Sequence, residues 1–149
     1  MPHPILLYDG VCGLCNRFVQ FIIRRDPNAI FRFASLQSAL ASRILARHNL
    51  NPSHLDTVYV VVNPDSHSPN GDTNEDTNGL LLSRSAAALF VLAQLRGPWH
   101  AAAFMLRLLP KFLLDSAYNA VARHRYRIFG RSDTCPLPSA QDRNRFLDL

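Results

Sequence analysis

Residues 5–15 read Ile5-Leu6-Leu7-Tyr8-Asp9-Gly10-Val11-Cys12-Gly13-Leu14-Cys15 and join a short apolar run to a pair of cysteines. The apolar run predicts a buried strand over 5–8, because it stops at Asp9-Gly10 as a strand does when it enters a loop. Residues 15–25 mix apolar with polar positions and stop at Asp26-Pro27, which predicts a helix with a wide buried face. The cysteine pair therefore stands where a strand passes into a helix.

The chain after this helix continues to alternate between strands and helices. Residues 30–34 alternate with the period of two that is typical of a strand, and apolar side chains then recur every four residues up to Asn49, as in a helix. Residues 57–62 carry the strongest strand signal in the chain, and 80–82 are the predicted partner strand. Between these two strands, the polar residues 63–79 predict a long hairpin loop.

Helices are predicted for most of the second half. Ser83 is a suitable N-cap for an alanine-rich helix that closes at Arg96-Gly97-Pro98. Further helices are expected over about 99–109 and 110–125, followed by an irregular tail. A chain of 149 residues fits one domain of ordinary size, so we expect a single α/β domain over 1–149. Its predicted order is β-α-β-α-β-β-α, with 99–149 as a helical C-terminal extension.

The composition, with 48% hydrophobic and 18% charged residues, excludes a disordered or fibrous chain. Residues 1–78 carry six basic and seven acidic side chains, whereas residues 79–149 carry ten and four, so the positive charge belongs to the second half. The longest uncharged apolar stretch, 85–95, has 11 residues, fewer than the roughly 18 that a membrane-spanning helix needs. The first residues also lack the segments of a secretory signal, so we expect a cytoplasmic protein.

Cys12 and Cys15 form the strongest functional motif. Unpaired backbone N–H groups and the helix dipole favour an anion at a helix N-terminus, so a thiolate at Cys12 would be stabilised there. The thiolate is the nucleophile in disulfide exchange, and Cys15 stands one helical turn on, where it can attack a mixed disulfide and release the product. We therefore predict that Cys12 attacks a substrate disulfide and that Cys15 resolves the intermediate.

Two other interpretations of the cysteine pair stay open. With Cys135 the pair could belong to a metal site, although the six histidines are scattered and no second ligand pair has the spacing of a structural zinc site. The cysteines could also be buried thiols without chemistry. Cys135 itself is either a third redox cysteine or a small buried side chain in a tail that contains prolines. We predict no metal and no cofactor.

Asp9 lies three residues before Cys12, near enough to take a proton from Cys15 when the mixed disulfide is resolved. The alternative is that its carboxylate caps the loop or the helix. A charged Asp9 beside Cys12 would also raise the pKa of that thiol and oppose the helix dipole. We predict Asp9 as the third catalytic residue.

The basic residues of the second half point to two kinds of surface. Residues 123–131 interleave basic with aromatic side chains, which could contact nucleic acid. The favoured alternative is a set of cations at a helix C-terminus with Tyr126, Ile128 and Phe129 packed inward, so we expect no nucleic-acid partner. Residues 84–111 contain no acidic side chain. Two apolar helices with basic residues at intervals could rest on an anionic membrane surface. We keep this peripheral membrane contact beside the alternative of plain core helices.

The chain also resembles a known family along nearly its whole length. Residues 8–16 look like the Asp-x-x-Cys-x-x-Cys signature of the DCC family of thioredoxin-like thiol-disulfide oxidoreductases. Further similar segments are Phe33-Ala34-Ser35-Leu36-Gln37-Ser38, Ser83 with Ala86-Ala87, Gly97-Pro98-Trp99, and Arg125-Tyr126-Arg127-Ile128-Phe129-Gly130 with Cys135. The resemblance implies a thioredoxin-like fold with a central mixed four-stranded sheet. It also implies a redox role for Cys12 and Cys15, with Asp9 as the family's acidic residue.

Two positions differ from thioredoxins at large. Many thioredoxins place a cis-proline just before the strand that faces the CxxC motif, whereas Asp56-Thr57 precede that strand here. The dipeptide Gly13-Leu14 lacks the histidine of some strongly oxidising relatives, which favours the reduction of substrates.

We therefore expect a thiol-disulfide oxidoreductase that acts as a disulfide reductase. Its partners would be a disulfide-containing protein or small thiol substrate and an unidentified electron donor. The alternative is a non-catalytic thioredoxin-like binding module whose basic C-terminal half contacts a protein or a membrane surface.

Overall fold

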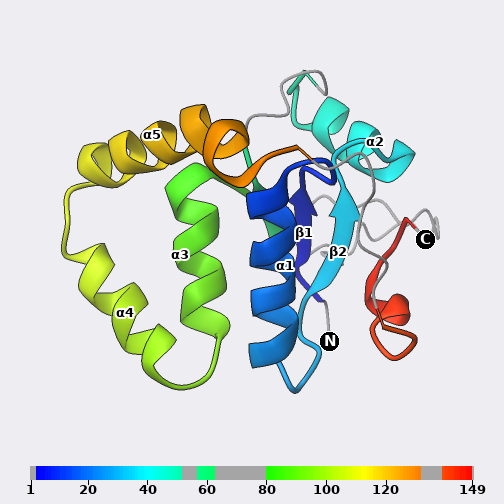
Figure 1. Ribbon diagram of the computed structural model, residues 1–149, viewed down its shortest axis with the longest axis horizontal. Helices are drawn as coiled ribbons and strands as arrows, with labels where there is room; N and C mark the ends of the chain where they lie inside the picture. Colours follow the sequence, from blue (N-terminus) through cyan, green and yellow to red (C-terminus); the bar gives the residue numbers. More distant parts are fainter. Residues whose placement is uncertain (1–2, 52–56, 63–79, 132–138, 149) are drawn as a thin grey trace, which may run out of the picture.

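Figure 1 shows the computed structural model, which describes residues 3–51, 57–62, 80–131 and 139–148. In chain order, the elements are β1 (Ile5–Tyr8), α1 (Gly13–Arg25), β2 (Arg32–Ser35), α2 (Ala39–Arg47), β3 (Tyr59–Val62), β4 (Leu80–Ser83), α3 (Arg84–Gln94), α4 (Pro98–Arg107), α5 (Lys111–Phe129) and the 3-10 helix η1 (Arg143–Arg145). The loop predicted over 63–79 lies outside the described residues.

The four strands form one mixed sheet in the order β2-β1-β3-β4. β1 and β2 are parallel, whereas β3 is antiparallel to both β1 and β4. A parallel pair needs a crossover connection between its strands, and α1 lies in that connection. This topology is that of a thioredoxin-like fold, and it confirms the predicted order of strands and helices.

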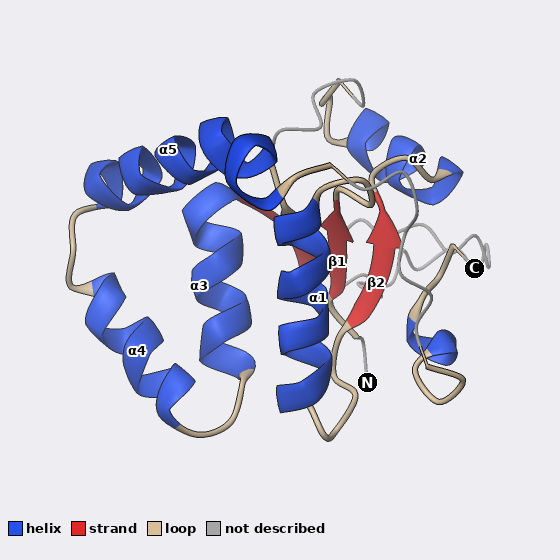
Figure 2. Ribbon diagram, viewed as in Figure 1, coloured by secondary structure: helices blue, strands red, loops and turns tan. Residues whose placement is uncertain are grey.

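The central strand β1 is buried on both faces, because side chains alternate between the two faces of a sheet. Leu6 and Tyr8 belong to the core that α1 and α3 cover, whereas Leu7 packs in a second core with residues of α2. In Figure 2, α1 lies in front of the sheet beside β1 and β2. Packing on both faces therefore holds the end of β1, and with it the start of α1, in a fixed position.

Two boundaries near the cysteines differ from the predicted ones. α1 begins at Gly13, before the predicted residue 15, because Cys12 has an extended backbone and already acts as the N-cap residue. β2 ends at Ser35, because its parallel register with β1 continues to the pair of Tyr8 with Ser35. Cys12 thus lies directly at the helix N-terminus, and Cys15 lies within the first turn instead of being its first residue.

α5 also continues past its predicted end at residue 125 and stops at Phe129. No helix breaker occurs before Gly130, which takes the positive φ of +73° that favours glycine. Arg125 and Tyr126 therefore project from a regular helix. Among the described residues, no helix combines the length and the hydropathy that crossing a membrane would need.

The last described residues pack against the β2 side of the core. Phe146 is buried and contacts Phe33, with ring centroids 5.2 Å apart. Arg145 is buried too, and its Nη2 lies 2.5 Å from Asp26 Oδ2. The same carboxylate accepts hydrogen bonds from two backbone N–H groups of the segment that leads into β2. Asp26 and Arg145 thus connect the end of α1 to the C-terminal tail.

Arg145→Met is expected to lower the free energy of unfolding by about 3–5 kcal/mol, because Asp26 would stay buried without its cation. Urea denaturation measures the change. Arg143→Met is the matched control, since Arg143 is exposed, and it is expected to cost less than about 0.5 kcal/mol. Equal losses in the two variants would contradict a stabilising role for the buried pair.

Candidate active site

Both cysteines lie at the N-terminal end of α1, directly after the loop that follows β1. The backbone N–H of Cys12 donates to the Asp9 carbonyl at 3.2 Å, and the Cys12 carbonyl accepts from the Asn16 N–H at 3.0 Å. The Asn16 side chain closes the loop by donating to the Gly10 carbonyl at 3.1 Å. This turn fixes Cys12 at the N-cap and Cys15 in the first turn of the helix.

Asp9 is 1% exposed and is surrounded by donors. Its Oδ1 accepts from the Val11 N–H at 3.1 Å and from Gln37 Nε2 at 2.8 Å. Its Oδ2 accepts from Arg125 Nη2 at 3.4 Å and from the Tyr126 hydroxyl. A carboxylate offers about four acceptor positions, and here four donors occupy them. Asp9 therefore caps the loop, as one interpretation of the sequence predicted, and also contacts α5.

Arg125 reaches the cysteines from α5 and is 3% exposed. Its Nη1 lies 3.9 Å from Cys15 Sγ, and its Nη2 contacts Asp9 and donates to the Tyr126 hydroxyl at 3.0 Å. Burial, followed by the hydrogen bond to Asp9, raises the pKa of Tyr126 to about 12, so this hydroxyl is protonated at neutral pH and donates. One guanidinium thus connects a sulfur, a carboxylate and a phenol.

The two thiols ionise very differently. The hydrogen bond from the Cys15 thiol lowers the pKa of Cys12 to about 6, with help from the backbone N–H groups of Cys15 and Leu14 and the charge of Arg125. The same thiol–thiol hydrogen bond, together with burial, raises the pKa of Cys15 well above its ordinary value. The thiolate is therefore favoured at Cys12, as its place at the helix N-terminus predicted. The opposing charge expected from Asp9 is offset because Arg125 contacts that carboxylate.

The end of α5 covers Cys12, which has no exposed surface. The Gly13 N–H donates to the Gly130 carbonyl at 3.3 Å, and Cys12 forms an isolated antiparallel bridge with Arg131. A Cβ atom at Gly13 would lie 2.4 Å from the Phe129 carbonyl oxygen, so this close approach requires glycine. In Figure 1 the orange end of α5 lies beside the dark blue first turn of α1.

The residues just before β3, the strand that faces the CxxC motif, differ from those of many thioredoxins. No cis peptide bond occurs in the part of the chain that the structure describes. The N–H of Val58, just before β3, donates to the hydroxyl of Tyr118 on α5 at 3.0 Å. This backbone group is therefore occupied by α5 and is not offered to a substrate.

The structure brings Asp9, Cys12 and Cys15 together, and it adds residues that the sequence pattern did not single out as members of the site. Arg125 and Tyr126 belong to the run 123–131, which was interpreted as a helix end or a nucleic-acid surface. The similarity of this segment and of the segment containing Gln37 to the DCC pattern was the one signal that could have found them.

Other sequence-based expectations concern residues farther along the chain. Ile128, which was expected to pack inward, is exposed. Cys135 lies outside the described residues, so its redox and metal interpretations stay predictions. No group of three or more His, Cys, Asp or Glu suited to a metal ion occurs among the residues that are described.

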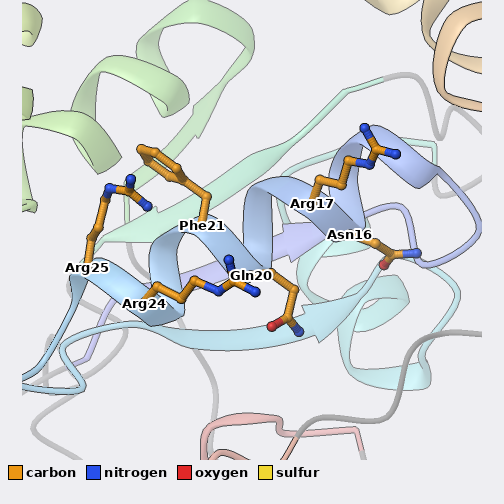
Figure 3. Close-up of a pocket in the computed structure, with 6 residues that line it drawn as sticks. All are labelled: Asn16, Arg17, Gln20, Phe21, Arg24 and Arg25. Atoms are coloured by element: carbon orange, nitrogen blue, oxygen red, sulfur yellow. The ribbon is translucent and has the colours of Figure 1, made fainter.

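A cationic groove runs along α1 from the residue after Cys15 (Figure 3). Its volume is about 360 Å³, and its lining residues are Asn16, Arg17, Gln20, Phe21, Arg24 and Arg25. Arg25 is held in place by stacking over the Phe21 ring at 4.1 Å. None of the three arginines forms an ion pair with an acidic group in the described ranges, so the groove favours anionic groups.

The profile of a family described as DCC1-like thiol-disulfide oxidoreductase matches residues 6–131. The chain belongs to this family. The matched region includes the CxxC motif together with Arg125 and Tyr126, so it covers every side chain that meets at Asp9. Membership in the DCC1-like family identifies thiol-disulfide redox chemistry as the general activity.

Two relatives are similar over nearly all of this DCC1-like chain. Uncharacterized protein YuxK of Bacillus subtilis (strain 168) is 37% identical over 147 residues, which are 99% of this chain and 96% of the relative. DCC family protein At1g52590, chloroplastic, of Arabidopsis thaliana is 36% identical over 135 residues, which are 91% of this chain and 70% of the relative. No solved structure matches the chain.

Arg125→Met is expected to raise the pKa of Cys12 above its value of about 6, because the thiolate loses a nearby positive charge. With a pKa of about 6, the Cys12 thiol of the wild type is mainly ionised at pH 7, and this ionised fraction falls in the variant. A pH titration of the ultraviolet thiolate absorbance of the reduced protein measures both. Arg123→Met, an exposed position on the same helix, is the control. The same midpoint in both variants would rule out an effect of the Arg125 charge.

Proposed function

We propose that this DCC1-like chain is a disulfide reductase in which Cys12 is the nucleophile, Cys15 is the resolving thiol and Asp9 assists proton transfer. The observation that carries the proposal is the arrangement of the two cysteines at the start of α1, with the guanidinium of Arg125 between Cys15 and Asp9. A helix N-terminus and a nearby cation favour a thiolate, which is the reactive form in disulfide exchange.

The reaction proceeds through two exchanges of a sulfur–sulfur bond. The Cys12 thiolate attacks one sulfur of a substrate disulfide, forms a mixed disulfide and releases the other substrate sulfur as a thiolate. Cys15 then loses its proton and attacks the Cys12 sulfur, which forms the Cys12–Cys15 disulfide and releases the second substrate thiolate. Protonation of the two leaving thiolates completes a two-electron reduction of the substrate and oxidation of the dithiol.

Asp9 assists the second exchange, because its carboxylate and the Cys15 sulfur share the guanidinium of Arg125. The four donors around Asp9 hold its carboxyl group in one orientation, so its first effect is to keep Arg125 beside the cysteines. When the Tyr126 hydroxyl turns to another acceptor, Asp9 Oδ2 becomes free to take the proton of Cys15. Resolution then does not depend on hydroxide, although burial disfavours the Cys15 thiolate.

The moderate pKa of Cys12 supports the reductive direction. A value of about 6 is closer to the roughly 7 of thioredoxin than to the roughly 3.5 of the strong oxidant DsbA. Strong stabilisation of the reduced form makes a dithiol oxidising, and Cys12 has only moderate stabilisation. An external thiol donor then returns two electrons to the Cys12–Cys15 disulfide.

A substrate reaches Cys12 when the segment Gly130–Arg131 moves away, since Cys12 is fully buried and this segment pairs with the backbone of Cys12 and Gly13. The groove on α1 supports substrates that carry acidic groups, because Arg17 lines it two residues after Cys15 and Arg24 lines it farther along the helix. A disulfide-containing protein with an acidic segment and an anionic small disulfide both have this chemistry.

The geometry favours the enzyme over the predicted alternative of a non-catalytic binding module. Binding alone requires no pair of thiols with opposite ionisation, whereas disulfide exchange by a dithiol uses a thiolate that attacks and a second thiol that resolves the intermediate. The cytoplasmic location stays a prediction.

Cys12→Ser is expected to abolish disulfide reduction, whereas Cys15→Ser is expected to accumulate a mixed disulfide, because the intermediate forms and is not resolved. Turnover of oxidised glutathione or a disulfide-linked acidic peptide, followed by intact mass spectrometry, measures both effects. Cys135→Ser is the control and is expected to keep its turnover. Persistent turnover in Cys12→Ser would refute the assignment of roles.

Asp9→Asn is expected to slow resolution by about a hundredfold at neutral pH, the lower part of the range for a positioned base. The resolution rate of the variant should rise with pH, because hydroxide must then remove the Cys15 proton, whereas the wild-type rate should change little. Stopped-flow measurement of thiol release from a preformed mixed disulfide gives both profiles. Gln37→Ala, which removes a donor to Asp9 and leaves the carboxylate, is the matched control. Identical profiles for Asp9→Asn and the wild type would exclude Asp9 as the proton acceptor.

A further inference from the structure

The corner between α4 and α5 presents large apolar side chains to solvent. They recur in pairs every four residues and are between 42% and 74% exposed: Phe104, Met105, Leu108, Leu109, Phe112 and Leu113. Most monomeric globular proteins expose no more than a few hundred Å² of contiguous apolar surface, and six side chains of this size are exceptional for one short segment. We call these six residues the apolar corner. These six residues lie outside the core, whereas plain core helices were one of the two predictions for this part of the chain.

The charge around the apolar corner is positive. Arg107 and Lys111 are exposed within it, and the sequence has no acidic residue from 77 to 114. The first acidic residue after the corner is Asp115, and its carboxylate accepts a hydrogen bond from the Ser85 hydroxyl of α3. The corner therefore combines exposed apolar side chains with cations, and the stretch 77–114 that contains it supplies no carboxylate to offset them.

We propose that the apolar corner docks on a membrane surface that contains anionic lipids. Phe and Leu side chains enter the boundary between headgroups and acyl chains, while Arg107 and Lys111 contact lipid phosphates. A second copy of this chain fits the surface less well, because it would bring the cations of both copies together. In Figure 1 the yellow connection between α4 and α5 lies at the outer edge of the molecule, where a flat bilayer can reach it.

Docking at this corner leaves the end of α5 that carries the candidate active site away from the lipid surface. α5 begins at the corner with Lys111 and carries Arg125 at the active site, a separation of roughly 21 Å along a helix that rises 1.5 Å per residue. The cysteines would thus stand above the lipid surface. Substitutions at the corner should change membrane binding and leave the proposed reduction of a soluble disulfide unchanged.

Flotation of the reduced full-length protein tests the proposal, with vesicles of phosphatidylcholine alone or mixed with phosphatidylglycerol. The wild type is expected to float with the anionic vesicles, and Phe104→Ser/Leu108→Ser/Phe112→Ser should reduce the partition coefficient by at least about tenfold. Arg107→Gln/Lys111→Gln should reduce it by about 30-fold on anionic vesicles, since each cation contributes about 1 kcal/mol there. Leu80→Ser is the control, because Leu80 is 65% exposed and lies away from the corner on β4.

Circular dichroism and turnover of oxidised glutathione verify that each variant is folded and active. Loss of flotation in the two corner variants, with normal flotation of Leu80→Ser, supports the proposal. Absence of wild-type flotation, equal flotation of all variants, or a dimer in sedimentation velocity that the triple substitution dissociates would each overturn it. Since turnover is measured separately, failure of membrane docking is distinguishable from failure of the reductase proposal.

Discussion

A carboxylate and a guanidinium that leave water need partners, and Asp9 and Arg125 supply each other's charge at 3.4 Å inside the protein. This contact joins the loop after β1 to α5, two segments far apart in the chain. Gln37 and Tyr126 complete the donors around Asp9, so the carboxylate keeps one orientation. The geometry of the candidate site depends on this pair, because the guanidinium that contacts Asp9 also contacts the Cys15 sulfur.

The thiol chemistry follows from that contact and from the position of Cys12 at a helix N-terminus. The hydrogen bond from the Cys15 thiol, the backbone N–H groups and the Arg125 charge favour the Cys12 thiolate, whereas the same thiol–thiol hydrogen bond and burial disfavour charge on Cys15. The Cys12 thiol is therefore the one that ionises near neutral pH, whereas the Cys15 thiol stays protonated. The two cysteines differ in their surroundings even though only two residues separate them.

α5 has three separate tasks along its length. Its first turn belongs to the apolar corner. In its middle, the Tyr118 hydroxyl accepts a hydrogen bond from the residue just before β3, and its last turns supply Arg125 and Tyr126. The segment after it covers Cys12, and Gly13 permits that approach because it has no Cβ atom. The C-terminal helices therefore complete the site that the first strand and helix begin, and they offer a surface that the site does not use.

Local sequence patterns determined the strands, the helices around the cysteines and the place of the CxxC motif. The reason is that strand and helix periodicity and the Asp-Gly, Asp-Pro and Gly-Pro breakers act within a few residues. They also predicted Asp9, Cys12 and Cys15 as the candidate site residues, which stand within one short stretch. Only the tertiary structure decided that Arg125 turns inward while Arg123 and Arg127 stay exposed, since a run of alternating cations has no local signal for the one that meets a buried carboxylate. It likewise decided that Phe104, Leu108 and Phe112 remain outside, because an apolar helix is compatible with a core or a surface until its neighbours are placed.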